Sequence, residues 1–377
     1  MALLQKRYIF LTAVLTLLLL PRLHGKDALF EIYREAGEVT SVVHYGNEIW
    51  VSSYGRGLHY YNLTTGVWNS FSTEKKNIEN DFFYCVAVSE SYIWAGTSDG
   101  LMIYDRKRKA WRKRKFASGG EYGNWIRSLY YDKEQGQLWI GRFVNLTRFD
   151  EKKNKFDDFD LTQNKLTGSN NIKVIRPEGE KYLWIGTESG VFLYNKALEP
   201  SDRSALTFYS NKGNGFRGEG ESVSISDVLP EDKYVWIATE EFITPDQPDF
   251  NLGGIYRFNR RATWDKFDKR TGLKANGISA IARMGRNMFA ATYVFDSNSK
   301  QGAGKGITMF DRMTGKPLPF DPEQIKLETN DISQLYFDGE HLWIGTKIGL
   351  WKVKMNNAFA NPDFRSSRQI SNSKKNN

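Results

Sequence analysis

The residue types that most often perform catalysis or bind metals are scarce and scattered in this sequence. The 377-residue chain has one cysteine, Cys85, and four histidines, His24, His44, His59 and His341. No two of the histidines have the spacing of metal ligands. A serine-centred nucleophile elbow and a paired carboxylate in a clear context are also missing from the sequence. The sequence therefore predicts neither a catalytic site nor a cofactor, although acidic calcium sites stay open as an alternative.

A different chemistry is indicated by arginine, glutamate, lysine and aromatic residues that recur at equivalent places of a repeat. Such groups around a concave mouth would suit a sugar or an acidic metabolite, because rings stack on aromatic faces and charged groups bind hydroxyls or carboxylates. For each residue, the alternative is an ordinary solvated position in a loop. The predicted ligand-binding residues are Tyr54, Arg56, Arg142, Phe143, Glu188, Arg217, Glu240, Tyr293 and Lys347.

These residues are positioned by a phrase of the type LWIGT that occurs seven times. Its aromatic anchors are 44 to 54 residues apart, at Trp50, Trp94, Trp139, Trp184, Trp236, Phe289 and Trp343. A period of about 40–50 residues is typical of propellers and solenoids. Each repeat also divides into four short runs rich in Val, Ile, Tyr, Phe and Trp, which is the pattern of strands. The sequence therefore predicts an all-β fold, a seven-bladed β-propeller of four-stranded antiparallel blades, over residues 28–355.

The last repeat lacks a fourth strand of its own. The chain after Val353 is polar and contains Pro362, whereas the run Leu29–Tyr33 before the first repeat has the pattern of an outer strand. Pairing of this run with residues 349–355 would complete the last blade and leave no exposed seam. We therefore expect an N-terminal outer strand to close the ring.

Three long segments are predicted to share one rim of the propeller. In a four-stranded antiparallel blade, the turn between the second and third strands lies on the same rim as the link from an outer strand to the next inner strand. The insertions 240–252 and 293–305 are turns of the first kind, and 211–221 is a link of the second kind. Binding residues concentrate in loops held by a rigid scaffold, so we expect the ligand site on this rim. Neutral drift of surface loops is the alternative.

The two ends of the sequence differ from the repeats. Residues 1–25 combine Lys6 and Arg7 with a 12-residue apolar run, Ile9–Leu20, which predicts a secretory signal peptide and a periplasmic or secreted protein. An uncleaved anchor is the alternative, and no integral membrane span is expected after cleavage. Residues 356–377 are rich in Ser, Asn, Lys and Arg and are predicted to be a disordered tail.

The positive charge of the chain is concentrated in a few places. The formal net charge of +9 falls to about +2 without the leader and the tail, and Arg106–Lys115 alone holds eight Lys or Arg residues. This distribution gives no continuous basic face, so nucleic acid is not an expected partner. The basic segment is interpreted as protection of a sheet edge, with contact to an anionic surface as the alternative.

The repeats resemble the two-component regulator propeller repeat over most of residues 28–355. Residues 330–353 read NDISQLYFDGEHLWIGTKIGLWKV, residues 170–195 match nearly as well, and the resemblance weakens in repeats five and six. It implies the exported sensor half of a hybrid histidine kinase that binds a glycan or another small ligand. The sequence departs from that arrangement, because no kinase or regulator domain follows. We expect an exported binding protein of the sensor type; the alternatives are an envelope protein–protein interaction scaffold and a propeller lyase or lactonase.

Overall fold

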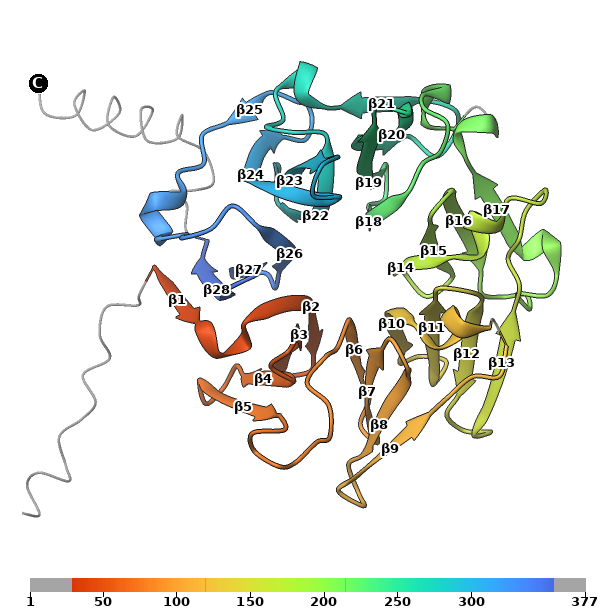
Figure 1. Cartoon of the computed structure of the whole chain (residues 1–377), viewed down its shortest axis with the longest axis vertical. Coiled ribbons are helices and arrows are strands. Elements are labelled where there is room, and N and C mark those ends of the chain that lie inside the picture. Colours follow the sequence, from red (N-terminus) through yellow and green to blue (C-terminus); the bar gives the residue numbers. More distant parts are fainter. Residues whose placement is uncertain (1–28, 119, 214, 356–377) are drawn as a thin grey trace, which may run out of the picture.

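The chain folds into a ring of seven four-stranded antiparallel sheets. The structure, a computed structural model, describes residues 29–118, 120–213 and 215–355. Figure 1 shows the sheets as blades around a central opening, with blade 2 across the ring from blades 5 and 6. The predicted fold class, a seven-bladed β-propeller, is confirmed. The predicted leader, 1–25, and tail, 356–377, lie outside the described residues, among which no helix is long and apolar enough to cross a membrane.

Each blade runs from an inner strand at the opening to an outer strand at the perimeter. Blades 1 to 3 are β2 (Glu38–Tyr45), β3 (Glu48–Tyr54), β4 (Leu58–Asn62) and β5 (Val67–Phe71); β6 (Cys85–Val88), β7 (Tyr92–Thr97), β8 (Gly100–Asp105) and β9 (Ala110–Arg114); and β10 (Ile126–Asp132), β11 (Gln137–Arg142), β12 (Leu146–Asp150) and β13 (Lys155–Phe159). Blades 4 and 5 are β14 (Ile172–Glu178), β15 (Tyr182–Thr187), β16 (Gly190–Asn195) and β17 (Leu206–Tyr209); and β18 (Ile225–Pro230), β19 (Val235–Thr244), β20 (Gln247–Phe258) and β21 (Trp264–Phe267). Blades 6 and 7 are β22 (Gly277–Met284), β23 (Asn287–Asp296), β24 (Gln301–Asp311) and β25 (Pro317–Leu318); and β26 (Ile332–Phe337), β27 (His341–Thr346), β28 (Gly349–Lys354) and β1 (Phe30–Tyr33).

Short 3-10 helices occupy most of the connections between blades. They are η1 (Arg34–Ala36), η2 (Glu121–Asn124), η3 (Thr167–Asn170), η5 (Asn211–Gly213), η6 (Phe216–Gly218), η7 (Lys269–Thr271) and η8 (Pro322–Ile325), while η4 (Arg203–Ala205) lies within blade 4. Asn or Asp residues anchor several links by accepting a backbone N–H from the end of the preceding blade. Asn170 Oδ1 accepts from Leu161 N at 2.9 Å, and Asp81 Oδ1 accepts from Thr73 N at 2.9 Å.

The repeated phrase is explained by packing between neighbouring blades. Its glycine allows the inner strand of the next blade to approach, because a Cβ on Gly141 would lie 2.7 Å from Ile172 Cγ2, and a Cβ on Gly186 would lie 2.6 Å from Ile225 Cγ2. Its tryptophan is buried in the same interface: Trp94 is fully buried in one cluster with Phe149 of blade 3. A large side chain at such a position stabilises the fold by roughly 3–5 kcal/mol relative to alanine.

The N-terminal strand β1 closes the ring as predicted. It pairs with β28 in antiparallel register, with Phe30 opposite Val353 and Ile32 opposite Trp351. The ring of Tyr33 stacks on Trp68 of blade 1 with centroids 3.9 Å apart, so β1 joins the last blade to the first. Residues at the two ends of the described chain therefore form one blade.

The long segments on the predicted rim are ordered elements. The sequence predicts long loops at segments 240–252 and 293–305, because they are insertions between the second and third strands of their blades. In the structure they lie within two hairpins, since β19 and β20 stay paired as far as Thr244 and Gln247, and β23 and β24 as far as Asp296 and Gln301. The link 211–221 contains η5 and η6, and its Phe216 is buried. Tertiary pairing outweighs the turn-like composition of these segments.

Candidate functional site

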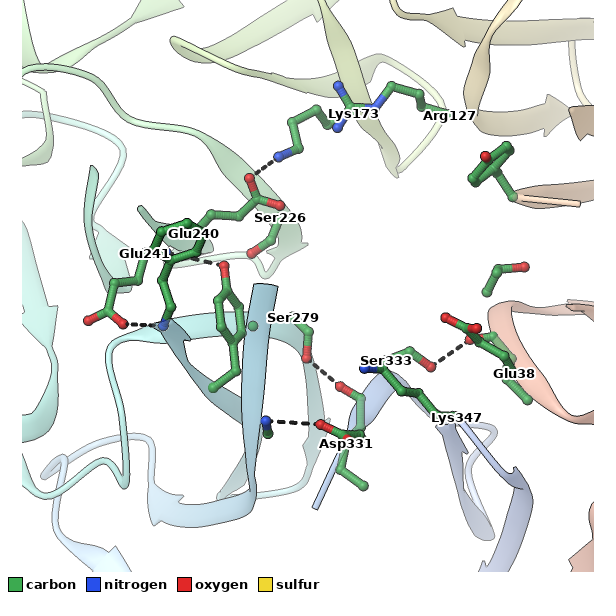
Figure 2. Close-up of a pocket in the computed structure, with 18 of the residues that line it drawn as sticks. Glu38, Arg127, Lys173, Ser226, Glu240, Glu241, Ser279, Asp331, Ser333 and Lys347 are labelled. Carbon is green, nitrogen blue, oxygen red and sulfur yellow. Dashed lines mark hydrogen bonds and ion pairs between the residues drawn. The ribbon is translucent and has the colours of Figure 1, made fainter. Parts of the chain in front are cut away.

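A cavity of about 600 Å³ opens at the mouth of the central channel, on the rim from which the two long hairpins rise. We call this rim the hairpin rim and this space the mouth cavity. All seven blades contribute to its wall, and Figure 2 shows Lys173, Glu240, Asp331 and Glu38 arranged around it. A pocket at the axis of the ring has side chains of many blades within reach of one ligand, which is the usual setting of a small-molecule site.

The wall of the mouth cavity is built by β-bulges. In six blades the register between the inner strand and the second strand shifts at one residue of the inner strand. This residue directly follows the apolar residue near the start of the inner strand. A bulge re-aims a side chain, and here the bulged residues line the mouth cavity. These residues are Thr40, Arg127, Lys173, Ser226, Ser279 and Ser333, with Tyr84 at the equivalent place in blade 2.

The bulged residues divide the cavity wall into two sides. In blades 6, 7 and 1 a hydroxyl donates to a carbonyl of the next blade: Ser279 Oγ to Ile332 O at 2.6 Å, Ser333 Oγ to Val39 O at 2.6 Å, and Thr40 Oγ1 to Phe83 O at 2.8 Å. In blades 3 and 4 the same place holds a cation. In blade 5, the buried hydroxyl of Ser226 has no hydrogen-bond partner among the described residues. Among the described residues, the equivalent side chains of blades 3 to 5 therefore lack this bond to a carbonyl of the next blade.

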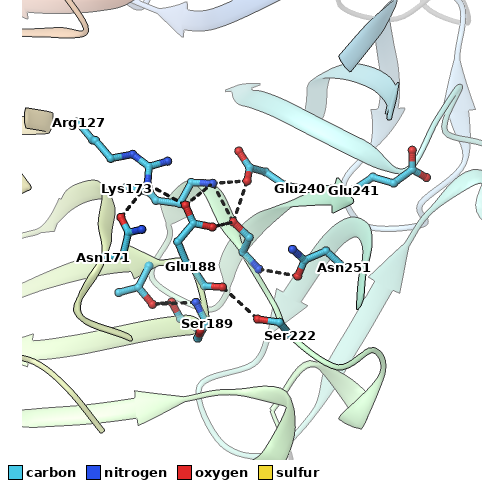
Figure 3. Close-up of polar contacts among 12 residues, drawn as sticks. Arg127, Asn171, Lys173, Glu188, Ser189, Ser222, Glu240, Glu241 and Asn251 are labelled. Atoms are coloured by element: carbon cyan, nitrogen blue, oxygen red, sulfur yellow. Dashed lines mark hydrogen bonds and ion pairs between the residues drawn. The ribbon is translucent and has the colours of Figure 1, made fainter. Parts of the chain in front are cut away.

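Arg127 and Lys173 belong to one network of charges, drawn in Figure 3. Arg127 Nη1 donates to Glu188 Oε1 at 2.7 Å and to Asn171 Oδ1 at 2.7 Å. Lys173 Nζ donates to Ser224 Oγ at 2.8 Å and forms ion pairs with Glu188 and with Glu240 of the blade 5 hairpin. The Lys173 side chain is 7% exposed, so loss of either carboxylate would leave a partly buried cation poorly compensated.

The cations determine the protonation of Glu188. Burial of this carboxyl favours its neutral form, but the charges of Lys173 and Arg127 and the hydrogen bonds from Arg127 and Ser224 outweigh burial and lower the pKa of Glu188 to about 2. Glu188 is therefore a carboxylate at neutral pH. The network presents both charged acceptors and charged donors to the mouth cavity.

Glu241 and Tyr293 join the hairpins of blades 5 and 6 to each other through hydrogen bonds. Glu241 Oε2 accepts the Phe295 N–H at 2.9 Å, and the Tyr293 hydroxyl accepts the Glu241 N–H at 3.2 Å. The Tyr293 ring fits over two glycines, because a Cβ on Gly277 would lie 2.6 Å from the ring and one on Gly302 would lie 2.8 Å from it. Burial raises the pKa of Glu241 and that of Tyr293. These contacts make the hairpins a fixed wall of the mouth cavity.

A chain of aromatic rings leads away from the mouth cavity over blades 3, 2 and 1. We call it the aromatic arc. Successive centroids are 5.3 to 5.7 Å apart from Tyr122 to Tyr54, and Trp125 and Phe143 are stacked within 8° of parallel. Such rings provide flat apolar faces beside the polar cavity. Its members are Tyr122, Phe143, Trp125, Tyr84, Tyr54 and Phe82.

The structure gathers some of the predicted site residues and separates others. Glu240, Tyr293 and Lys347 line the mouth cavity. Glu188 joins them through Lys173, and Phe143 and Tyr54 belong to the aromatic arc. Arg56, Arg142 and Arg217 do not line the mouth cavity: Arg56 is exposed, and Arg217 is paired with Glu219 at 3.4 Å.

The side chain of Arg142 does not reach the mouth cavity, contrary to the expectation from the sequence. It stands where most repeats have a threonine, and the sequence predicts a ligand contact there. Its side chain is 0% exposed and holds the link between blades 2 and 3: Nη1 donates to Gly123 O at 2.7 Å, and Nη2 lies 3.0 Å from Asp158 Oδ2. The departure from the repeat is explained by this structural role, because a buried guanidinium satisfies several carbonyls at once.

Sequence reasoning missed Arg127, Lys173, Tyr84 and Trp125. The first three occupy a position that the repeats align, directly after the apolar residue near the start of each inner strand. Read around the ring, that position is Thr, Tyr, Arg, Lys, Ser, Ser, Ser. This break from small hydroxyl residues to charged and aromatic ones is a signal in the sequence. Its meaning depends on the bulge, which the sequence does not reveal.

The acidic residues and histidines of the described parts of the chain are dispersed. Within residues 29–118, 120–213 and 215–355, no group of three or more His, Cys, Asp or Glu residues is arranged to hold a metal ion. Of the three histidines in the described residues, His59 is buried beside Tyr33, His341 lies beside Asp338, and His44 Nε2 lies 2.9 Å from Gly46 O.

Comparisons with known proteins identify the fold. No protein-family model matches the chain, and no curated protein matches it. The solved extracellular domain of the putative one component system BT4673 from B. thetaiotaomicron, also described as a putative hybrid two component system, is 20% identical with a TM-score of 0.62; the match covers 88% of this chain and 40% of that one. The chain thus spans less than half the length of that structure. The expected likeness to propellers of two-component regulators is confirmed for the fold.

Two other solved structures share the architecture. PorZ, an essential bacterial surface component of the type-IX secretion system of Porphyromonas gingivalis, is 13% identical with a TM-score of 0.60, over 84% of this chain and 46% of that one. Virginiamycin B lyase from Staphylococcus aureus is 12% identical with a TM-score of 0.59, over 87% of this chain and 100% of that one. At these identities the likeness establishes the propeller fold and carries no argument about catalysis.

Proposed function

We propose that this chain is an exported β-propeller of the sensor type that binds a glycan or a small polar metabolite in the mouth cavity. The observation that carries the proposal is the ring formed by the six bulged side chains and Tyr84, which brings residues from all seven blades to one cavity of about 600 Å³. Its charged side, with Arg127, Lys173 and Glu240, offers donors and acceptors for hydroxyl and carboxylate groups. Tyr84 and Trp125 offer aromatic faces beside them.

The proposed role is binding without catalysis. Arg127, Lys173, Glu188 and Glu240 compensate one another, and this mutual pairing suits recognition of a polar ligand better than proton transfer. The leader predicts that the chain is exported. Its fold is shared with the extracellular domain of BT4673. An envelope protein–protein interaction scaffold is the alternative, favoured by the exposed apolar residues on the same rim.

A ligand screen tests the proposal. We expect a rise in the melting temperature of the purified chain with one class among neutral sugars, acidic sugars and organic acids, and calorimetry should then give the Kd. Lys347→Ala should raise that Kd about tenfold, because the exposed ammonium lines the mouth cavity. Lys316→Ala, an exposed lysine on the opposite rim, is the matched control and should leave the Kd unchanged.

Three results would argue against the proposal. They are the absence of a thermal shift with every compound, an equal loss of affinity in Lys347→Ala and Lys316→Ala, and stabilisation by calcium alone. Stabilisation by calcium alone would instead favour an acidic metal site, and with it the alternative of a propeller lyase or lactonase.

A further inference from the structure

The exposed apolar side chains of this protein are unevenly distributed. Nine large apolar side chains are exposed in the described part of the chain, and six of them lie on the hairpin rim. Of the other three, Leu198 and Met313 lie in connections on the opposite rim, and Val67 is the first residue of β5 at that rim. Single exposed apolar residues are ordinary, but their concentration on one face marks an interaction surface. The six are Tyr54, Phe82, Tyr122, Phe242, Val294 and Ile348, which are 36% to 55% exposed.

The hairpin rim is stepped. In blades 2, 4 and 7 the second strand ends at a threonine, whereas in blades 5 and 6 it runs five and four residues beyond the equivalent Thr239 and Thr292, to Thr244 and Asp296. At about 3.3 Å per residue, the hairpins are about 15 Å longer than the turns of the other blades. Blade 2, whose turn is short, lies diametrically opposite blades 5 and 6 (Figure 1). The rim therefore has a high half and a low half.

We propose that the hairpin rim binds the hairpin rim of a second copy of this chain, face to face about a two-fold axis. A surface with one high half and one opposite low half is complementary to itself, because the two-fold axis places each high half over the low half of the partner copy. The mouths of the two channels then face each other. The arrangement does not depend on the identity of a ligand.

The seven-fold spacing of the blades specifies which residues meet. The hairpin of blade 6 falls over the junction between blades 1 and 2 of the other copy, and that of blade 5 over the junction between blades 2 and 3. Each of the two hairpins and each of the two junctions carries an exposed apolar residue. Val294 of the blade 6 hairpin meets Phe82, and Phe242 of the blade 5 hairpin meets Tyr122.

The charges of the two halves are complementary as well. Asp246 and Asp249 are exposed on the blade 5 hairpin and form no ion pair among the described residues. The facing blade 2 has Lys113 and Lys115, which share a single carboxylate, Asp99, at 2.5 and 2.9 Å. Opposite charges at the edge of an apolar contact favour this register over others.

The mass of the purified full chain in solution, measured by light scattering, tests the dimer. We expect twice the mass of one chain, and a return to the mass of one chain in Phe242→Glu and in Tyr122→Glu, because each places a carboxylate against an apolar partner. Met313→Glu changes an exposed apolar residue on the opposite rim and should leave the dimer intact. Melting curves would check that each variant is folded.

Cross-linking tests the register independently. The native thiol, Cys85, is buried, so new cysteines react without interference. Copies with Val294→Cys mixed with copies with Phe82→Cys should form a disulfide-linked pair, whereas Val294→Cys mixed with Met313→Cys should not. A chain that stays monomeric at every soluble concentration would overturn the proposal, as would a dimer dissociated by Met313→Glu. A polysaccharide or a different protein as the true occupant would give the first of these results.

Discussion

The charged residues of the mouth cavity show how the context of a side chain decides its chemistry. Arg127 and Lys173 occupy the same place in the blade as Ser279 and Ser333, yet the serines join neighbouring blades while the cations gather carboxylates. Their energetic contribution depends on pairing, because a partly buried charge is favourable only with a partner. Two single-residue predictions follow from this principle.

The first prediction concerns Glu188, whose pKa is lowered from its ordinary value of 4.5 to about 2. A depressed pKa means that the stabilisation is fully present above pH 4.5 and is lost as the pH falls through about 2. Glu188→Gln should therefore lower the free energy of unfolding at neutral pH by about 2 kcal/mol and flatten its decline between these limits. Urea denaturation at a series of pH values measures both effects. Parallel pH profiles for the variant and the parent chain would contradict the prediction.

The second prediction concerns His59, which is buried beside the Tyr33 hydroxyl at 3.1 Å. Burial lowers the pKa of His59 from 6.5 to about 4, so the unfolded chain binds a proton at a higher pH than the folded chain. Stability is therefore greatest above pH 6.5 and declines toward pH 4, by up to about 3 kcal/mol. His59→Phe should remove this decline, and thermal melts across the window would show it. An unchanged slope in the variant would assign the decline to other groups.

Among the connecting elements, the link between blades 2 and 3 depends on one buried side chain. Arg142 donates to Ser118 O at 3.1 Å and to Gly123 O at 2.7 Å, and pairs with Asp158. Arg142→Ala should cost about 3–5 kcal/mol, because it leaves those carbonyls and the carboxylate without their partner. Urea denaturation measures the cost, and limited proteolysis should then cut within residues 117–124. Arg56→Ala removes an exposed arginine and should change stability by less than about 0.5 kcal/mol.

For the whole molecule, the ring is held closed by a strand of four residues, β1. Tyr33→Ala removes the stacking on Trp68 and the bond to His59, and we expect a loss of about 2–4 kcal/mol. Because the seam joins the last blade to the first, amide exchange should accelerate first in blades 7 and 1. Glu31→Ala alters an exposed residue of the same strand and serves as the control. Uniform acceleration in all blades would show that the ring opens as one unit.

The sequence by itself determined the architecture, because a propeller is specified locally. Each copy of the phrase brings its own aromatic anchor, a tryptophan in six copies and Phe289 in the other, and several copies bring a glycine that admits the next blade, so a period and an orphan strand suffice to predict seven blades and their closure. The positions of Glu240, Tyr293 and Lys347 on one rim follow from the antiparallel order of the strands, because all three residues lie at the predicted connection between a second and a third strand. These features could be predicted without any knowledge of distant contacts.

Tertiary structure alone decided which side chains reach the axis. The bulges at Arg127 and Lys173 turn these residues toward the channel, and their partners Glu188 and Glu240 come from other positions in the ring. Arg142 breaks the repeat as clearly as these residues do, yet it faces the inside of a link. A deviation in sequence marks a special position, but only the packed chain fixes whether that position faces a ligand or the core, because orientation depends on contacts between residues that are distant in sequence.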